Sequence, residues 1–274
     1  MLVQDAIAES PRRTGAAEAF IQSRMALGRV AFALSDLMKE SGLSEIAAKR
    51  QLSRLRDKVV RISARQPFFL IVAPEHRSFG APPPVWWLHE YFDWLDRPYY
   101  LALQSAASLF DSNPQALQVT QVITDKPSRD ISLGRVQVRF FVKVGIRRTP
   151  TQQPAGAVAP LCVSTPEATV LDLVRYAASI GGIERAAETI VPLLNMLRPQ
   201  ELKRALEAEN EIAVAQRLGF VLDAIGAKKL AQIVQTWLPE KLRPVGLSQI
   251  QETHGRFPLV ERWQVLNTSK ELNV

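Results

Sequence analysis

The pattern of apolar and polar positions in the first 75 residues predicts a series of short elements. Residues 14–27 have a helix-forming composition with large apolar anchors, and Gly28 follows them as a stop signal. Residues 29–33 are mostly apolar with one aromatic side chain, which favours a brief strand. A short helix followed by a short strand is therefore expected to open the N-terminal domain.

Two capped helices are predicted after this strand. Ser35 is the expected N-cap of the helix DLMKES, and Gly42 ends that helix about two turns later. Ser44 is the expected N-cap of the next helix, which lies in the run SEIAAKRQLSRLRDK at 44–58. Two short helices separated by Gly-Leu have the spacing of a helix-turn-helix.

A hairpin is predicted directly after the two helices. Residues 59–63 and 68–72 form two β-type runs, and the intervening ARQP places Pro67 at the turn. A helix-turn-helix followed by a hairpin with a basic tip is the arrangement of a winged helix. The proline-rich stretch at 81–85 then marks a stiff linker, so a winged helix-turn-helix DNA-binding domain is expected at 1–80.

The rest of the chain is predicted to be a larger α/β domain at 86–274 that is mostly helical. Aromatic side chains recur at helical spacing between 86 and 100, which favours core packing. Strands are expected within about 119–145, and helices from 164 to 240, where Thr165 is the N-cap of the first. The predicted fold class is therefore α+β, with an N-terminal winged helix and a larger C-terminal domain.

Composition narrows the chemistry that the chain can carry. Of its 274 residues 47% are hydrophobic, and no apolar run approaches the roughly 18 to 20 residues that cross a bilayer. One cysteine and three scattered histidines give no metal-ligand spacing, and the sequence contains no Walker or GxGxxG loop. We therefore expect a cytoplasmic protein with no membrane segment, no metal and no cofactor.

The positive charge is in excess in two segments, 1–75 and 119–150, and within the first it is densest at 44–65. This stretch holds seven basic and two acidic side chains, a density expected of a surface that contacts phosphate. On a helical wheel Ala48, Leu52, Leu55 and Val59 form the buried stripe, and the basic side chains lie opposite.

DNA is the partner that these local patterns favour. An exposed basic helix is often only solvated, and winged helices also dock proteins, but the preceding helix and the following hairpin agree with DNA binding. The predicted contacts are Ser44, Ile46, Ala47 and Arg50 for the major groove, Lys49, Arg54 and Lys58 for phosphates, and Arg61 and Arg65 on or beside the wing.

The order of the segments resembles a known family. With the SRL of the basic helix, the stretches RPYYLALQSAASLF at 97–110 and STPEATVLDLVRYA at 164–177 resemble the AbiEi family, the antitoxins of type IV toxin–antitoxin systems. The resemblance runs from about residue 10 to the C-terminus. It implies a transcriptional autorepressor that binds inverted repeats in its own promoter through a winged helix. It also implies a C-terminal domain that counters a cognate nucleotidyltransferase toxin without a stable complex, in abortive infection and phage defence.

A second basic segment at 119–150 carries seven basic and two acidic side chains. Arg139 should be exposed, because it lies on the opposite face of its strand from Val138 and Phe140. In the light of the resemblance the segment either extends the DNA footprint, contacts RNA or a nucleotide substrate of the toxin, or forms an ordinary solvated sheet face. Its members are Lys126, Arg129, Arg135, Arg139, Lys143, Arg147 and Arg148.

Two other functions are alternatives to the antitoxin. A restriction-type nuclease needs an acid followed by Glu/Asp-X-Lys on an adjacent strand to bind Mg²⁺. Asp125 could begin such a set, but the next strand offers Gln137-Val138-Arg139 and no carboxylate. No catalytic residue is therefore predicted, and the chain is not expected to be an enzyme. A stand-alone winged-helix regulator, with a C-terminal domain that senses a ligand or partner, stays open as the alternative.

Overall fold

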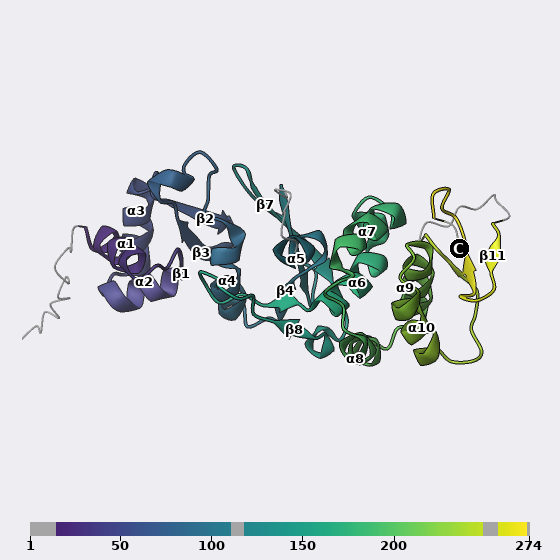
Figure 1. Cartoon of the computed structure of the whole chain (residues 1–274). Coiled ribbons are helices and arrows are strands. Elements are labelled where there is room, and N and C mark those ends of the chain that lie inside the picture. Colours follow the sequence, from purple (N-terminus) through teal and green to yellow (C-terminus); the bar gives the residue numbers. More distant parts are fainter. Residues whose placement is uncertain (1–14, 111–117, 249–256, 273–274) are drawn as a thin grey trace, which may run out of the picture. The chain divides into compact units, whose positions relative to one another are not determined.

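The chain folds into two compact units, which are described separately. The computed structural model describes residues 15–110, 118–248 and 257–272 (Figure 1). Within these ranges it is a mixed α+β protein with ten α-helices and three sheets, which agrees with the predicted class. The first unit contains the residues up to Leu95 together with 131–136, and the second contains 96–130 and the residues after 136.

The first unit begins with three helices and three short strands in the order that the apolar pattern predicts. Its antiparallel sheet has the strand order β1-β3-β2, in which β2 and β3 are the arms of a hairpin. The elements are α1 (Ala16–Ala26), β1 (Ala31–Ala33), α2 (Leu34–Ser41), α3 (Glu45–Arg54), β2 (Val59–Ser63) and β3 (Gln66–Ile71).

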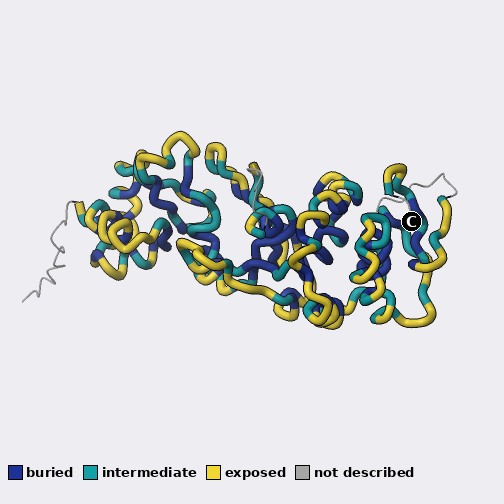
Figure 2. Tube along the Cα trace, viewed as in Figure 1, coloured by how far each residue is buried: buried dark blue, intermediate teal, exposed yellow. Residues whose placement is uncertain are grey.

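One apolar core joins these helices to the sheet, and it appears in dark blue in Figure 2. Phe20 of α1 meets Phe32 of β1 edge-on, with ring centroids 5.1 Å apart. α3 contributes Ala48 and Leu52, both buried, so the predicted buried stripe is confirmed at these positions, whereas Leu55 is only half-buried. Each large apolar side chain buried in this way stabilises the fold by roughly 1.5–3 kcal/mol.

The predicted caps on either side of the turn between α2 and α3 are confirmed. Gly42 ends α2 with a φ of 69°, in the left-handed region that favours glycine. The Oγ of Ser44 accepts a hydrogen bond of 3.3 Å from the backbone N–H of Ala47. α3 therefore starts at a fixed point, and this fixes which of its side chains face outward.

Two local predictions in this unit are wrong. Ser35 is not an N-cap, because α2 begins one residue before it and the carboxylate of Asp36 accepts the N–H of Ala33 at 2.9 Å. Pro67 lies within β3 and not at the turn. The pairing of β2 with β3 shifts register just before Ser63, and such a bulge accommodates a residue that cannot donate a hydrogen bond.

Aromatic side chains extend the first unit beyond the predicted linker. Two short 3-10 helices, η1 (Pro74–His76) and η2 (Pro84–Trp86), lead into α4 (Leu88–Trp94). Trp87 and Tyr91 are buried, and the Tyr91 ring meets that of Phe68 edge-on with centroids 5.4 Å apart. Core packing of these aromatics is therefore confirmed. The division into functional domains at 1–80 and 86–274 stays a prediction, and the compact units divide the chain later, after Leu95.

The second unit is built on a mixed sheet whose strands in this unit follow the order β7-β5-β4-β9-β8, whereas the residues of β6 belong to the first unit. β5 runs parallel to β7 and antiparallel to β4, whereas β4 runs parallel to β9. The strands expected within about 119–145 are confirmed. The bounds are β4 (Tyr99–Leu101), β5 (Val119–Thr124), β6 (Ile131–Leu133), β7 (Val136–Val142), β8 (Thr151–Gln152) and β9 (Val163–Ser164).

Helices surround this sheet and continue to residue 237. The predicted cap of α6 is confirmed, since the Oγ1 of Thr165 accepts the N–H of Ala168 at 3.3 Å. The bounds are α5 (Leu103–Phe110), η3 (Ile146–Arg148), α6 (Pro166–Arg175), η4 (Ala177–Ser179), α7 (Ile183–Ile190), η5 (Val191–Leu193), α8 (Pro199–Glu209), α9 (Ile212–Ala224) and α10 (Lys228–Trp237).

A small sheet near the C-terminus packs on α9. It contains β10 (Val245–Gly246), β11 (Leu259–Val260) and β12 (Val265–Leu266), which are too short to leave a period-two pattern. Trp263 is fully buried beside Gly219, where an added Cβ would lie 2.1 Å from the indole Cζ3. In the parts of the chain that the structure describes, helices are too short or too polar to span a bilayer.

Candidate functional site

The outward face of α3 carries the predicted groove residues. Ile46, Arg50 and Ser53 are exposed, and their spacing of four and three residues places them on one stripe of the helix. This stripe lies opposite the buried Ala48 and Leu52. The sequence therefore predicts correctly which side of α3 faces solvent, and Ile46 is exposed to 81%.

Arginine side chains supply this face with positive charge. Arg50 and Arg54 are both exposed, and within the described residues neither forms an ion pair. A planar guanidinium of this kind can donate two parallel hydrogen bonds to a guanine edge or to a phosphate. The two arginines are therefore available for a polyanion without the loss of an internal contact.

Two lysines predicted to contact phosphate have acidic partners on the surface. Lys49 pairs with Glu45 one turn earlier, and the hydrogen bond and charge of Lys49 hold the pKa of that carboxyl below its usual value. Lys58 lies 2.5 Å from Glu18, whose hydrogen bond and charge raise the pKa of the lysine. Both pairs are partly exposed and are worth little in water, so a phosphate could compete for either lysine.

The hairpin residues lie beside this helix in the same unit. The Nε of Arg61 donates to the backbone oxygen of Gln66 at 2.9 Å, and its guanidinium lies 6.0 Å from the ring centre of Phe69. These contacts hold the Arg61 side chain along the hairpin. Arg65 is exposed in the turn between β2 and β3. Of the other predicted contacts, Ser44 is committed to capping α3 and Ala47 is half-buried.

The second basic segment is exposed except at one position. Lys143 is not on the surface, because it lies directly after β7 and is only 2% exposed. Its amine is surrounded by carboxylates of the second unit. The predicted exposure of Arg139 is confirmed, and its Nε lies 3.7 Å from Asp130. The exposed members are Lys126, Arg129, Arg135, Arg139, Arg147 and Arg148.

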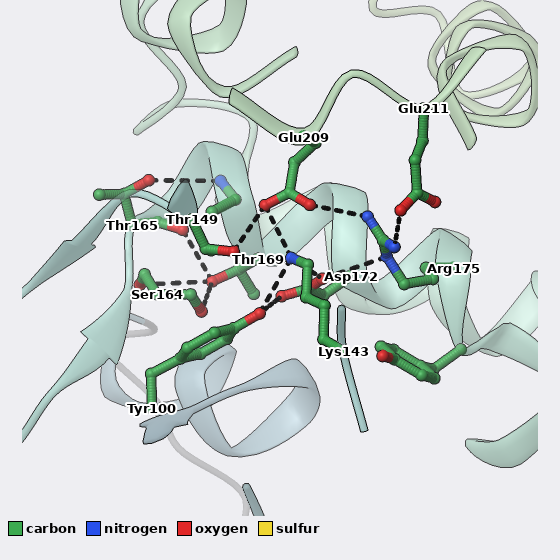
Figure 3. A network of polar contacts seen from close by, with 12 residues as sticks. Tyr100, Lys143, Thr149, Ser164, Thr165, Thr169, Asp172, Arg175, Glu209 and Glu211 are labelled. Carbon is green, nitrogen blue, oxygen red and sulfur yellow. Dashed lines mark hydrogen bonds and ion pairs between the residues drawn. The ribbon is translucent and has the colours of Figure 1, made fainter. Parts of the chain in front are cut away.

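Lys143 is the centre of a buried polar network, shown in Figure 3. Its Nζ donates to the hydroxyl of Tyr100 at 3.0 Å, to Asp172 at 2.9 Å and to Glu209 at 2.7 Å. Tyr100 donates in turn to the other oxygen of Asp172 at 2.8 Å. Thr149 also donates to Glu209, at 2.8 Å. The network joins β4, the end of β7, α6 and the end of α8.

Arg175 extends the network towards the surface of the second unit. Its guanidinium lies 2.7 Å from Glu209 and 3.6 Å from Asp172, and it also pairs with Glu211, the N-cap of α9 (Figure 3). With Lys143, two cations thus face three carboxylates. Burial raises the pKa of Asp172 despite the opposing effect of the Lys143 amine.

The motif STPEAT builds a second set of buried contacts beside this network. The hydroxyls of Ser164 and Thr169 lie 2.7 Å apart, and Thr169 also donates to the backbone oxygen of Thr165 at 2.8 Å. The buried carboxylate of Glu167 accepts the backbone N–H of Arg198, at the N-terminus of α8, at 2.9 Å. The polar residues of this motif therefore connect β9, α6 and α8.

The network has the features of a structural connection more than of a reactive site. The Lys143 amine is committed to three short hydrogen bonds within the network. Sequence reasoning missed the network as a whole. One signal could have found it: Asp172 lies in the apolar run VLDLV, where a carboxylate needs a buried partner.

Asp125, the acid considered for a nuclease, forms an ion pair with Arg97. Partial burial raises the pKa of Asp125, but the hydrogen bond and charge of Arg97 outweigh it and hold this pKa below its usual value. The Nε of Arg97 donates to Asp125 at 2.9 Å and its Nη1 donates to Ser128 at 2.8 Å. Across the described ranges no group of three or more His, Cys, Asp or Glu side chains could hold a metal ion.

Comparison with known proteins gives a domain family for one segment of the chain and a fold for most of it. The family model described as AbiEi antitoxin C-terminal domain matches residues 100–224. The crystal structure of the RV2827C protein from Mycobacterium tuberculosis is similar, with a TM-score of 0.63 and 16% identity over 91% of this chain and 90% of that one. At this identity the likeness indicates a shared fold alone.

A second solved structure is more distant. It is an antigenic nucleotidyltransferase-like protein from Paracoccidioides brasiliensis, with a TM-score of 0.37 and 12% identity over 55% of this chain and 90% of that one. A score this low supports no conclusion about fold or activity. Among curated proteins no match is found.

The matched segment contains the whole buried network, from Tyr100 to Glu211, and the motif STPEATVLDL. An antitoxin role is therefore supported by the same residues on which the sequence resemblance rests. By this match, residues 100–224 belong with the C-terminal domains of AbiEi antitoxins.

Proposed function

We propose that the chain is an antitoxin and transcriptional autorepressor whose first unit is a winged helix that binds its own promoter. The element order supports this, because the capped pair α2 and α3 directly precedes the hairpin of β2 and β3. One observation carries the DNA-binding proposal. The outward stripe of α3 presents Ile46, Arg50 and Ser53 to solvent, opposite its buried face.

Charge and position assign different roles to the residues around this stripe. Arg50 lies towards the middle of the stripe and is the proposed base contact, whereas Arg54 lies one turn further on and is proposed to bind phosphate. Lys49 and Lys58 would exchange their carboxylate partners for phosphates. Arg61 and Arg65 on the hairpin would contact the flanking backbone or the minor groove.

The second unit is the proposed antitoxin domain. The AbiEi match supports a toxin partner, and we propose that this toxin is a nucleotidyltransferase encoded beside the chain, countered without a stable complex. The exposed side chains of the second basic segment, Arg139 and Arg147 among them, are the proposed contacts with RNA or a nucleotide. Lys143 takes no part in such a contact, because it is buried.

A mobility-shift titration of the full chain on duplex DNA from its own upstream region tests the DNA-binding proposal. Arg50→Ala should weaken binding by about 5- to 150-fold, the cost of one lost bidentate base contact. Arg54→Ala should weaken binding to all sequences alike. Arg204→Ala is the matched control, because Arg204 is an exposed helical arginine of the second unit that pairs with a nearby carboxylate, Glu201. Equal affinity of all three variants and the wild type would contradict the proposal.

Co-expression with the neighbouring nucleotidyltransferase separates the two functions. A full-length variant with Arg50→Ala and Arg54→Ala should still rescue growth while it derepresses a promoter reporter. A variant with Arg139→Glu and Arg147→Glu should lose rescue and keep repression if these arginines serve the antitoxin. Loss of rescue in the first variant would show that neutralisation depends on DNA binding and would overturn the proposed division.

A further inference from the structure

Ile46 is an apolar side chain in an unusual position. It is the second residue of α3 and 81% exposed, in the turn that Ser44 caps. It lies on the same stripe as Arg50 and Ser53, directly opposite the core of the first unit. The side chain therefore contributes little to the fold.

Exposure alone does not make Ile46 a binding residue, since single exposed apolar side chains are common on protein surfaces. Leu27 of the same unit is 71% exposed and lies outside α3, and nothing around it indicates a ligand. Ile46 differs because the next outward residue on its stripe is Arg50, a cation without an acidic partner in the described chain. An apolar side chain next to such an arginine would fit a binding partner whose surface is charged and also carries an apolar group.

The major groove of DNA is such a surface. Its base edges present acceptors on guanine that suit arginine, and one apolar group, the 5-methyl of thymine. The positions of Ile46 and Arg50, four residues apart, differ by about 6 Å along the helix axis. Successive base pairs are about 3.4 Å apart, so the two side chains span about two base steps.

We propose that Ile46 is a specificity-determining residue that packs on the 5-methyl group of a thymine, about two base steps from the guanine that Arg50 contacts. This inference rests on the proposed binding of DNA by α3. It adds a base preference that charge cannot supply, because phosphates are the same at every position. The recognised half-site therefore contains a thymine close to a guanine.

Uracil substitution isolates the methyl group, because deoxyuridine differs from thymidine only by its loss. The probe is fluorescein-labelled duplex DNA from the chain's own upstream region, in which each thymine of the bound segment is replaced in turn. Wild-type protein should bind about fourfold more weakly when one particular thymine is replaced, the effect of losing one buried methyl contact. Ile46→Ala should bind the unmodified duplex about as weakly and should no longer distinguish thymine from uracil at that position.

Leu27→Ala is the matched control, because it removes another largely exposed aliphatic side chain from the same unit. This variant should keep the wild-type preference for thymine. If wild-type protein binds the duplex but responds equally to every replacement, or if Ile46→Ala keeps the preference, the inference is wrong and DNA binding stands. If wild-type protein does not bind the duplex at all, the proposed function fails and the inference fails with it.

Discussion

Replacing Lys143 by methionine should destabilise the second unit strongly. The substitution nearly keeps the length of the side chain and removes the amine that bonds both Asp172 and Glu209, at 2.9 and 2.7 Å. All three side chains are almost completely buried. Without Lys143, a single cation, Arg175, would face three carboxylates.

The magnitude follows from the cost of an uncompensated buried charge. Breaking a buried ion pair by removal of one partner typically costs about 3–5 kcal/mol of unfolding free energy. Lys49→Met is the matched control, because it removes a lysine from an exposed pair with Glu45 and should leave stability nearly unchanged. Adding Asp172→Asn to Lys143→Met should restore part of the loss, since it removes one of the unpaired carboxylates.

The loss of unfolding free energy in Lys143→Met should also depend on pH, and the contacts of Asp172 determine the sign of this dependence. Burial already raises the pKa of Asp172, and removal of the Lys143 amine would raise it further. A carboxyl whose pKa is raised by folding stabilises the fold below its unfolded pKa, and this contribution is lost as pH rises through the folded pKa. The difference between wild type and Lys143→Met should therefore be larger at pH 8 than at pH 5.

Urea unfolding followed by tryptophan fluorescence measures this difference, because Trp237 and Trp263 lie in the second unit. The reasoning would be refuted if Lys143→Met unfolded at the same urea concentration as Lys49→Met. If wild type and Lys143→Met differed in unfolding free energy by the same amount at pH 5 and pH 8, the role assigned to the Asp172 carboxylate would be refuted.

Three further predictions concern other parts of the chain. Gly219→Ala should lower unfolding free energy by about 1–3 kcal/mol, seen as a lower melting temperature, because its Cβ would enter the space of the Trp263 ring. Ser44→Ala should cost about 1 kcal/mol and Ser44→Gly much less in the same assay, because Ser44 caps α3; equal losses would mean that the cap is not the cause. Arg139→Glu with Arg147→Glu should leave melting unchanged but impair toxin neutralisation. Wild-type growth on co-expression with the toxin would instead mean that these residues form an ordinary solvated face.

Local sequence signals predict the first unit well, because its elements are defined by residues close together in the chain. Gly42 and Ser44 end and begin the two helices through their own backbone and side-chain preferences. The alternation of apolar and basic side chains along α3 identifies Arg50 as outward-facing for the same reason. The register of the hairpin around Pro67 could not be predicted from the sequence, since a bulge depends on the pairing with the partner strand.

The buried network could not be predicted in the same way, because it is assembled from distant segments. Lys143 appears in the sequence as one more basic residue at the end of an exposed strand. It is buried because α8 brings Glu209 to it across 66 positions and α6 brings Asp172 across 29. Only the carboxylate of Asp172 among apolar neighbours indicated that a buried cation was needed.

The central claim, that α3 binds DNA, is tested most directly by an anisotropy titration of the promoter duplex at several salt concentrations. The measurement compares full-length wild type with the Arg50→Ala/Arg54→Ala variant. Wild type should bind tightly with a steep salt dependence, and the variant should bind at least tenfold more weakly at low salt. The slope of log affinity against log salt should also fall by about one to two, since each lost phosphate contact accounts for about 0.9. The same affinity and the same slope for both proteins would contradict the account.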